Sequence, residues 1–151
     1  LSDYAENDFG VKMSVKEAEN FKEKFFDHYT GLRDWHKCTN NGNKYEARTL
    51  MGRRRLCVEK ASLNGRLNMP VQGTGTDIMK IALARLPKAL NGTGAKLVAI
   101  IHDEIILEVP EQRAEEAKKI LVSVMESAGE GFIDIPLVAE AAIADSWAGK
   151  A

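Results

Sequence analysis

Three adjacent side chains, His102, Asp103 and Glu104, are the best candidates for chemistry in this chain. They interrupt an apolar stretch, with Leu97 to Ile101 before them and Ile105 to Leu107 after them. Burying an ionised carboxylate without a partner costs on the order of several kcal/mol. The two acids are therefore expected to face a cation, a base or solvent, and a metal ion is the obvious cation. Taken alone, the stretch fits equally well a polar turn that merely joins two apolar strands.

Two amide side chains, Asn68 and Gln72, form a second candidate site on either side of Pro70. If this segment is helical, their spacing places both amides on one face. Amides donate and accept hydrogen bonds, which suits the minor-groove edges of base pairs, where the acceptors are nearly the same for all four pairs. The competing interpretation is that both amides cap helix ends.

Arg53, Arg54 and Arg55 form a third candidate site, because arginine is well suited to bidentate contact with phosphate. A run of arginines is also typical of a solvated surface. The local charge favours phosphate: the segment Lys44 to Arg66 holds seven basic and two acidic residues, although the net charge of the chain is -1. From Ile100 onward, eleven acidic residues face four basic ones. Such an arrangement suits a protein that binds a polyanion at one place and cations at another.

The elements around the acids predict an α+β fold. Val- and Ile-rich strands over 96–109, with His and Asp at the reversal, indicate a tight antiparallel hairpin with the carboxylates at its tip. Amphipathic helices are predicted from Asp77 to about Asn91 and from Pro110 to Gly129, and a third strand from Ile135 to Ile143. Helices would then pack on one face of a small antiparallel sheet.

The first part of the chain predicts further helices and a strand. Ser14 and Glu17 form a capping box, and the apolar spacing that follows indicates two helices with a bend at Thr30-Gly31. Residues 45–50 predict a strand that ends in a turn at Met51-Gly52. The aromatic residues of the predicted helices are expected in the core: Phe21, Phe25 and Trp35.

Length and composition indicate one soluble domain. The chain has 151 residues, of which 44% are hydrophobic, enough for one core. Cys38 and Cys57 match no metal or redox spacing, and the longest aliphatic run is too short for a membrane span. A cytoplasmic protein without a membrane partner is therefore expected. The first residue is Leu1 rather than Met, which suggests a piece of a longer protein.

Several segments together resemble the C-terminal part of a family A DNA polymerase. The most specific are NMPVQGTGTDIMK (Asn68 to Lys80), IIHDEIILEVP (Ile100 to Pro110) and IADSW (Ile143 to Trp147). The resemblance extends through MGRRR (Met51 to Arg55) to the pattern YA-x7-MS-x2-EAE-x-F from Tyr4 to Phe21. It therefore covers essentially the whole chain.

The resemblance implies a role for each candidate residue. Asp103 matches the palm aspartate that holds the catalytic Mg²⁺ ions, Glu104 matches its neighbouring acid, and His102 is similar to the histidine near the primer end. Asn68 and Gln72 match positions that follow the minor groove of the nascent duplex. The arginines, Arg53 to Arg55, match a basic turn near the fingers and the template.

The implied reaction is template-directed addition of deoxynucleotides to a primer, with primer-template DNA and deoxynucleoside triphosphates as partners. Residues 1–66 would form the end of the fingers, and residues 67–151 the second half of the palm. The family also uses an upstream aspartate on a D-Y-S-Q-I-E-L-like strand and a nucleotide-binding fingers helix, and neither motif is present here. Asn64 and Arg66 stand where the family pattern places an arginine on the next turn.

The fragment is therefore expected to be inactive alone and to need the remaining polymerase segments, on the same or a separate chain. A catalytically silent nucleic-acid-binding or oligomerising module of palm fold is the alternative. A metal hydrolase built on His102, Asp103 and Glu104 alone is disfavoured, because one hairpin tip supplies too few ligands.

Overall fold

A computed structural model describes residues 2–149 of the chain. It divides into two compact units, Leu1–Glu46 with Cys57–Leu67 and Ala47–Leu56 with Asn68–Ala151. The second unit holds both the hairpin and the amide pair, so it carries most of the candidate residues.

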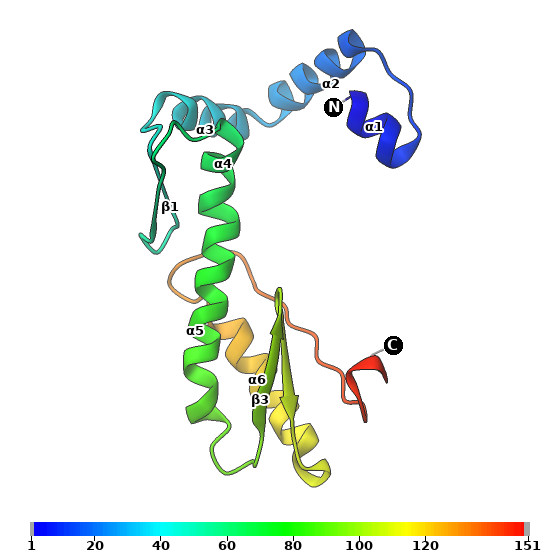
Figure 1. The fold of residues 1–151 in the computed structure, drawn as a ribbon, viewed down its shortest axis with the longest axis vertical. Helices are drawn as coiled ribbons and strands as arrows, with labels where there is room; N and C mark the ends of the chain where they lie inside the picture. Colours follow the sequence, from blue (N-terminus) through cyan, green and yellow to red (C-terminus); the bar gives the residue numbers. More distant parts are fainter. Residues whose placement is uncertain (1, 150–151) are drawn as a thin grey trace. The chain divides into compact units, whose positions relative to one another are not determined.

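The first unit is helical, with α1 (Ser2–Phe9), α2 (Val15–His28), α3 (Thr30–Asn41) and all but the last residue of α4 (Leu63–Asn68) (Figure 1). The predicted capping box begins α2: the Ser14 amide donates to Glu17 Oε2 at 2.8 Å, and the Glu17 amide donates to Ser14 Oγ at 3.2 Å. The predicted bend is also confirmed, because α2 and α3 meet at Tyr29. Helix α1 was not expected, since its sequence lacks clear periodicity.

The predicted aromatic core of this unit is wrong. Phe21 and Phe25 are 57% and 48% exposed, and Trp35 is only half-buried. The apolar spacing correctly predicts that these residues lie on helices, but it does not show that another element covers them. The buried Arg66 does connect two helices, since its Nη1 donates to the Thr39 carbonyl of α3.

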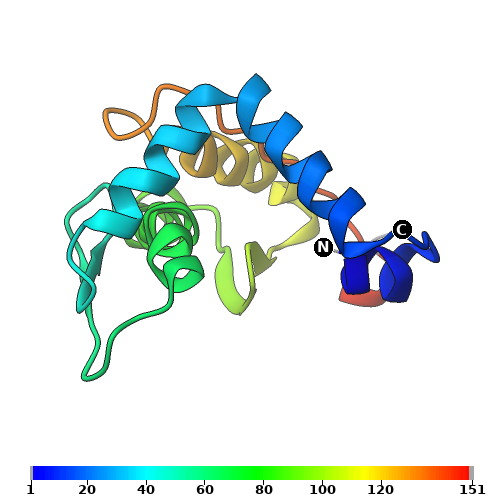
Figure 2. The ribbon, with the colours of Figure 1, turned by 90° about the horizontal axis from the view of Figure 1, so that it is seen from above.

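The second unit is built from α5 (Thr74–Ala89), β3 (Lys96–Ile101), β4 (Glu104–Glu108) and α6 (Ala114–Ser127), with a 3-10 turn, η2 (Glu111–Arg113), before α6. The strands form an antiparallel hairpin, and α5 and α6 pack against it (Figures 1 and 2). The central buried residues are Leu86, Leu90, Ala117 and Leu121, and they contact Ile105 and Leu107 of β4. The predicted α+β fold, with helices on a small antiparallel sheet, is confirmed.

A polar contact strengthens the packing of the two helices. Arg85 Nη1 of α5 donates to the Ser127 carbonyl at 3.0 Å, at the last residue of α6. Free carbonyls at a helix C-terminus carry partial negative charge, so a guanidinium there is favourable. Arg85 thereby links α5 to the C-terminal end of α6.

The strand and turn predicted over residues 45–52 are also present. Strands β1 (Glu46–Arg48) and β2 (Arg54–Leu56) form a second two-stranded sheet, and Gly52 in the turn has φ +84°. The arginines therefore lie at the turn and along β2. We refer to residues 49–55 of this hairpin as the basic arm.

The predicted third strand over Ile135–Ile143 is wrong, because the structure assigns no strand to these residues. A short apolar stretch that begins with proline is compatible with an extended chain, but a strand also needs a hydrogen-bonded neighbour. Here the segment makes other contacts: the Ala139 amide donates to Glu126 Oε1 of α6 at 3.2 Å.

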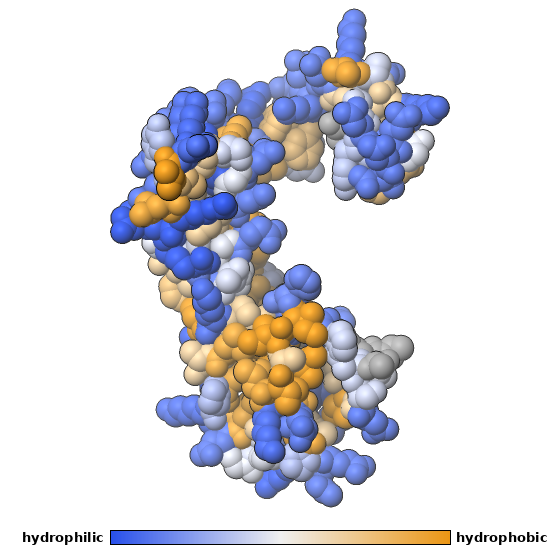
Figure 3. Space-filling view, in the orientation of Figure 1, coloured by the Kyte–Doolittle hydropathy of each residue, from blue (hydrophilic) through white to orange (hydrophobic). Residues whose placement is uncertain are grey.

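Apolar side chains lie on the surface of the second unit over the hairpin (Figure 3). Leu97, Val98 and Ile100 of β3 are 46%, 53% and 46% exposed. A bulge between Leu97 and Ala99 interrupts the alternation of the strand there. None of the helices within residues 2–149 is long and apolar enough to cross a membrane.

Candidate metal-binding hairpin and nucleic-acid interface

The turn of the β3–β4 hairpin consists of His102 and Asp103. Ile101 and Glu104 are the last paired residues, so the chain reverses over the two residues between them. His102 has φ +55°, in the left-handed region, where histidine is among the residues found more often than most. Both turn side chains are exposed. The predicted tight hairpin is confirmed, and Asp103 lies at its tip.

Glu104 lies in a different environment from Asp103. It is half-buried and is the first residue of β4, opposite Ile101. The two acids therefore differ in burial and in local structure, since Asp103 belongs to the turn and Glu104 to β4.

The donor atoms at the tip are suitable for Mg²⁺, which prefers carboxylate oxygens. However, no group of three His, Cys, Asp or Glu side chains placed to hold a metal occurs within the part of the chain that the structure describes. The carboxylates at the hairpin tip therefore fit part of a Mg²⁺ site, and the other ligands would have to come from other segments.

Asp103 and Glu104 also line a cavity of about 930 Å³ in the second unit. Its other walls come from α5, α6 and the residues that follow α6, including Asp145 and Trp147. Asp103, Glu104 and the IADSW sequence, far apart along the chain, thus line one cavity. Gly75 at the start of α5 lines it too, three residues after Gln72.

Asn68 and Gln72 are both exposed, on a helical segment that changes its geometry between them. Asn68 ends α4, and a π-helical turn, η1 (Met69–Gly73), follows and leads into α5. The Asn68 side chain makes no capping hydrogen bond, which argues against helix capping as its role. π-helical turns occur frequently at functional sites. Contact of these amides with a minor groove stays a prediction.

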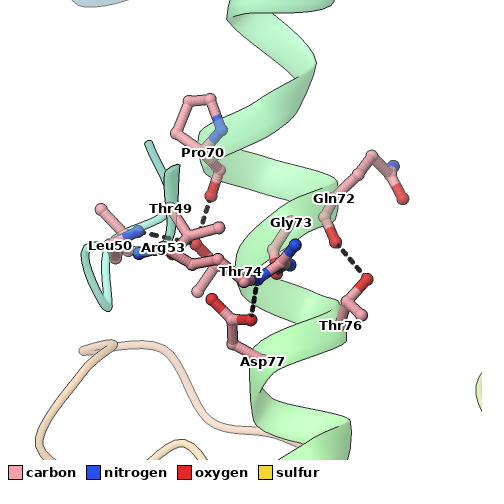
Figure 4. Close-up of polar contacts among 9 residues, drawn as sticks. All are labelled: Thr49, Leu50, Arg53, Pro70, Gln72, Gly73, Thr74, Thr76 and Asp77. Atoms are coloured by element: carbon pink, nitrogen blue, oxygen red, sulfur yellow. Dashed lines mark hydrogen bonds and ion pairs between the residues drawn. The ribbon is translucent and has the colours of Figure 1, made fainter. Parts of the chain in front are cut away.

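Arg53 is held by the beginning of α5. Its Nε donates to Asp77 Oδ1 at 2.5 Å, and its Nη2 donates to the Gly73 carbonyl at 3.0 Å (Figure 4). The Asp77 side chain is 9% exposed and that of Arg53 is 41% exposed. Arg54 and Arg55 are exposed on β2. The charge of Arg53 is thus offset within the protein.

The carboxyl group of Asp77 is affected by opposing influences. Burial raises its pKa, but hydrogen bonds from the side chains of Thr49 and Arg53, with the charges of Arg53 and Lys80, outweigh burial. The net result is a pKa below the usual value for aspartate, so Asp77 is ionised at neutral pH.

Sequence reasoning missed the pairing of Asp77 with Arg53, because Asp77 was interpreted only as the beginning of a helix. A signal was present. An acid on the apolar side of a helix needs a cation, and the arginine run is the densest group of cations in the chain.

The close approach of Thr49 to Gly73 predicts that Gly73 tolerates no side chain. A Cβ built on Gly73 would lie 2.7 Å from Thr49 Cγ2 and 3.2 Å from Met69 Sδ, whereas one on Gly75 meets nothing within 4 Å. Gly73→Ala should therefore lower the free energy of unfolding by about 1–3 kcal/mol through overpacking. Gly75→Ala is the matched control, expected to be neutral or to stabilise the helix by up to about 1 kcal/mol. Denaturant unfolding of both variants checks this, and identical midpoints would contradict it.

Comparison with known proteins agrees with the motifs. The sequence-family model of DNA polymerase family A matches residues 6–149. The chain is 34% identical to DNA polymerase I of Aquifex aeolicus, over 97% of this chain and 26% of the relative. It is 41% identical to the thermostable DNA polymerase I of Thermus filiformis, over 89% of this chain and 17% of the relative.

A solved structure is also similar. The POL domain of Pol1 from M. smegmatis, in complex with DNA primer-template and dNTP, superposes with a TM-score of 0.72 at 28% identity. The match covers 83% of this chain and 24% of that one. The chain thus spans about a quarter or less of the proteins it matches. With the family model matching residues 6–149, this chain belongs to DNA polymerase family A.

Proposed function

We propose that this chain is the C-terminal part of a template-directed DNA polymerase in replication or repair. It would act together with the remaining polymerase segments, on the same polypeptide or a second one; we call that complete protein the assembled polymerase. Residues 1–66 would belong to the fingers and residues 67–151 to the palm. The observation that carries the proposal is Asp103, exposed at the tip of a tight hairpin and lining a cavity with the IADSW segment.

In this proposal Asp103 holds Mg²⁺ by its carboxylate at the hairpin tip. Bound there, the metal would supply Lewis-acid stabilisation of the charge that develops during phosphoryl transfer. The short turn keeps Asp103 in place, since antiparallel pairing continues up to Ile101 and Glu104. Glu104, half-buried beside it, would tune the electrostatics of the tip.

The DNA contacts in this proposal come from the second unit. Asn68 and Gln72 would follow the minor groove, and His102 would lie near the primer end. The arginines, Arg53, Arg54 and Arg55, would contact phosphate, and Asp77 would offset part of the charge of Arg53. Support comes from the similar M. smegmatis structure, which holds primer-template and dNTP.

A catalytically silent module that binds nucleic acid or oligomerises is the second candidate. It is favoured by one observation: within residues 2–149, no three suitable side chains gather around one metal position. Under this candidate, substitution of Asp103 would leave the activity of the assembled polymerase unchanged.

Duplex binding tests the role of the arginines. In the assembled polymerase, Arg54→Ala combined with Arg55→Ala should weaken primer-template binding. It should also reduce the slope of log K against log salt by about one unit for each phosphate that the protein no longer neutralises. Titration between roughly 50 and 200 mM salt measures this slope.

Two control variants sharpen this test. Lys119→Ala removes an exposed charge from α6, outside the proposed interface, and should leave the slope unchanged. Gln72→Ala should slow extension with little effect on the slope, because it removes no charge. Equal slopes for the double arginine variant and the parent would show that these arginines are only a solvated surface.

A further inference from the structure

The π-helical turn η1 is held by side chains at several of its carbonyls (Figure 4). Thr74 Oγ1 donates to the Pro70 carbonyl, Thr76 Oγ1 to the Gln72 carbonyl at 3.0 Å, and Arg53 Nη2 to the Gly73 carbonyl at 3.0 Å. A wide turn disturbs the regular hydrogen bonds of an α-helix. Side chains compensate here, and one of them comes from outside the helix.

The basic arm is fitted closely to this turn. The Leu50 amide donates to Thr74 Oγ1 at 3.0 Å, and the Arg53 amide donates to Thr49 Oγ1 at 3.1 Å. Thr49 and Thr74 are only 5% and 4% exposed. Thr49 occupies the space that a side chain on Gly73 would need. The arm therefore fixes the residue next to Gln72.

The ion pair of Arg53 and Asp77 lies within this contact. Burying the Asp77 carboxylate offsets part of the stability that the pair contributes. Asp77 is buried, and its Oδ2 has no hydrogen-bond partner within the described structure. Buried ion pairs are often no more stabilising than apolar side chains of similar volume, but they can select one arrangement over others. The network of Thr49, Arg53, Thr74 and Asp77, which we call the clasp, thus favours one position of the turn.

We propose that Arg53 and Asp77 are positioning residues, which hold the π-helical turn so that the Gln72 amide meets the minor-groove acceptor of the base pair at the primer end. This inference rests on the proposed function, because it requires Gln72 to contact DNA. Gln72 itself is exposed and lies beside Gly73, whose carbonyl accepts a hydrogen bond from Arg53 and whose missing side chain leaves room for Thr49.

The test changes the DNA as well as the protein: it removes the minor-groove acceptor that the Gln72 amide would contact. Single-turnover incorporation is measured with the assembled polymerase on a normal duplex and on one with a 3-deazapurine at the primer end. The parent should be slower by about tenfold on the modified duplex, the scale of one missing hydrogen bond. Gln72→Ala should be slow on both duplexes and insensitive to the modification.

If the clasp positions Gln72, Asp77→Asn should also lose sensitivity to the 3-deazapurine, and adding Gln72→Ala to it should slow the enzyme no further. Arg53→Lys is a second variant that keeps the charge but loses the fork of Nε and Nη2, and it should behave in the same way. Glu115→Gln, an exposed change on α6, should keep the sensitivity of the parent.

Two results would overturn the inference, and they differ. If the parent is sensitive and both clasp variants are equally sensitive, the clasp does not act through Gln72, while the proposed function stands. If the parent itself ignores the 3-deazapurine, Gln72 makes no such contact, and both the proposed minor-groove role and the clasp inference fail.

Discussion

Asp103→Asn should lower the single-turnover rate of nucleotide incorporation by the assembled polymerase at least about a thousandfold. The substitution keeps the size of the side chain and removes the charge that would hold Mg²⁺. Asp103 is exposed in the turn, so the change should leave the hairpin folded. Primer-template affinity should barely change, because the missing interaction stabilises the transition state more than the bound duplex.

Glu104→Gln is the matched comparison at the neighbouring position. Glu104 lies in β4 and is half-buried, so it should act on the metal site from a distance. The expected loss is about tenfold to a hundredfold, as for groups outside the ligand shell. Both variants are measured across a magnesium titration. A Glu104 variant as inactive as the Asp103 variant would show that the two roles are wrongly assigned.

The 151-residue chain alone should not extend a primer. Within its described part no three acidic, His or Cys side chains form a metal site, so essential ligands are expected from other segments. Loss of an essential group commonly costs several orders of magnitude in rate. Primer extension is measured with the purified chain, with and without the remaining segments. Robust extension by the chain alone would contradict the account of what it lacks.

The parts of the fold that sequence predicts well are those decided by nearby residues. The capping box of Ser14 and Glu17 involves groups one helical turn apart, and the β3–β4 turn is decided by a few residues around His102. Both are present in the structure. The same holds for the break between α2 and α3 at Tyr29.

The failures concern contacts between distant residues. Phe21 and Phe25 lie on the predicted helix, but periodicity cannot tell whether another element covers them. Residues 135–143 have the pattern of a strand but no paired neighbour. The contact of Arg53 with Asp77 joins residues 24 positions apart, and a local pattern cannot show such a pairing.

The candidate site shows the same division. The position of Asp103 at a hairpin tip follows from the apolar residues on both sides of it, and the structure agrees. The clasp around Gly73 depends on the basic arm folding back on α5, so only the structure reveals it. The clasp gives Arg53 a contact with a helix turn, and phosphate contact by the arginines stays a prediction.

The most direct test of the central claim is to locate the metal. Fe²⁺ replaces Mg²⁺ in the assembled polymerase with primer-template and nucleotide, and ascorbate with peroxide then generates radicals that cleave the backbone beside the bound iron. The account predicts cleavage at the turn between β3 and β4, competed by Mg²⁺ and abolished in Asp103→Asn. Cleavage at this turn that persists in Asp103→Asn, or its absence in the parent, would contradict the assignment of Asp103 as a metal ligand.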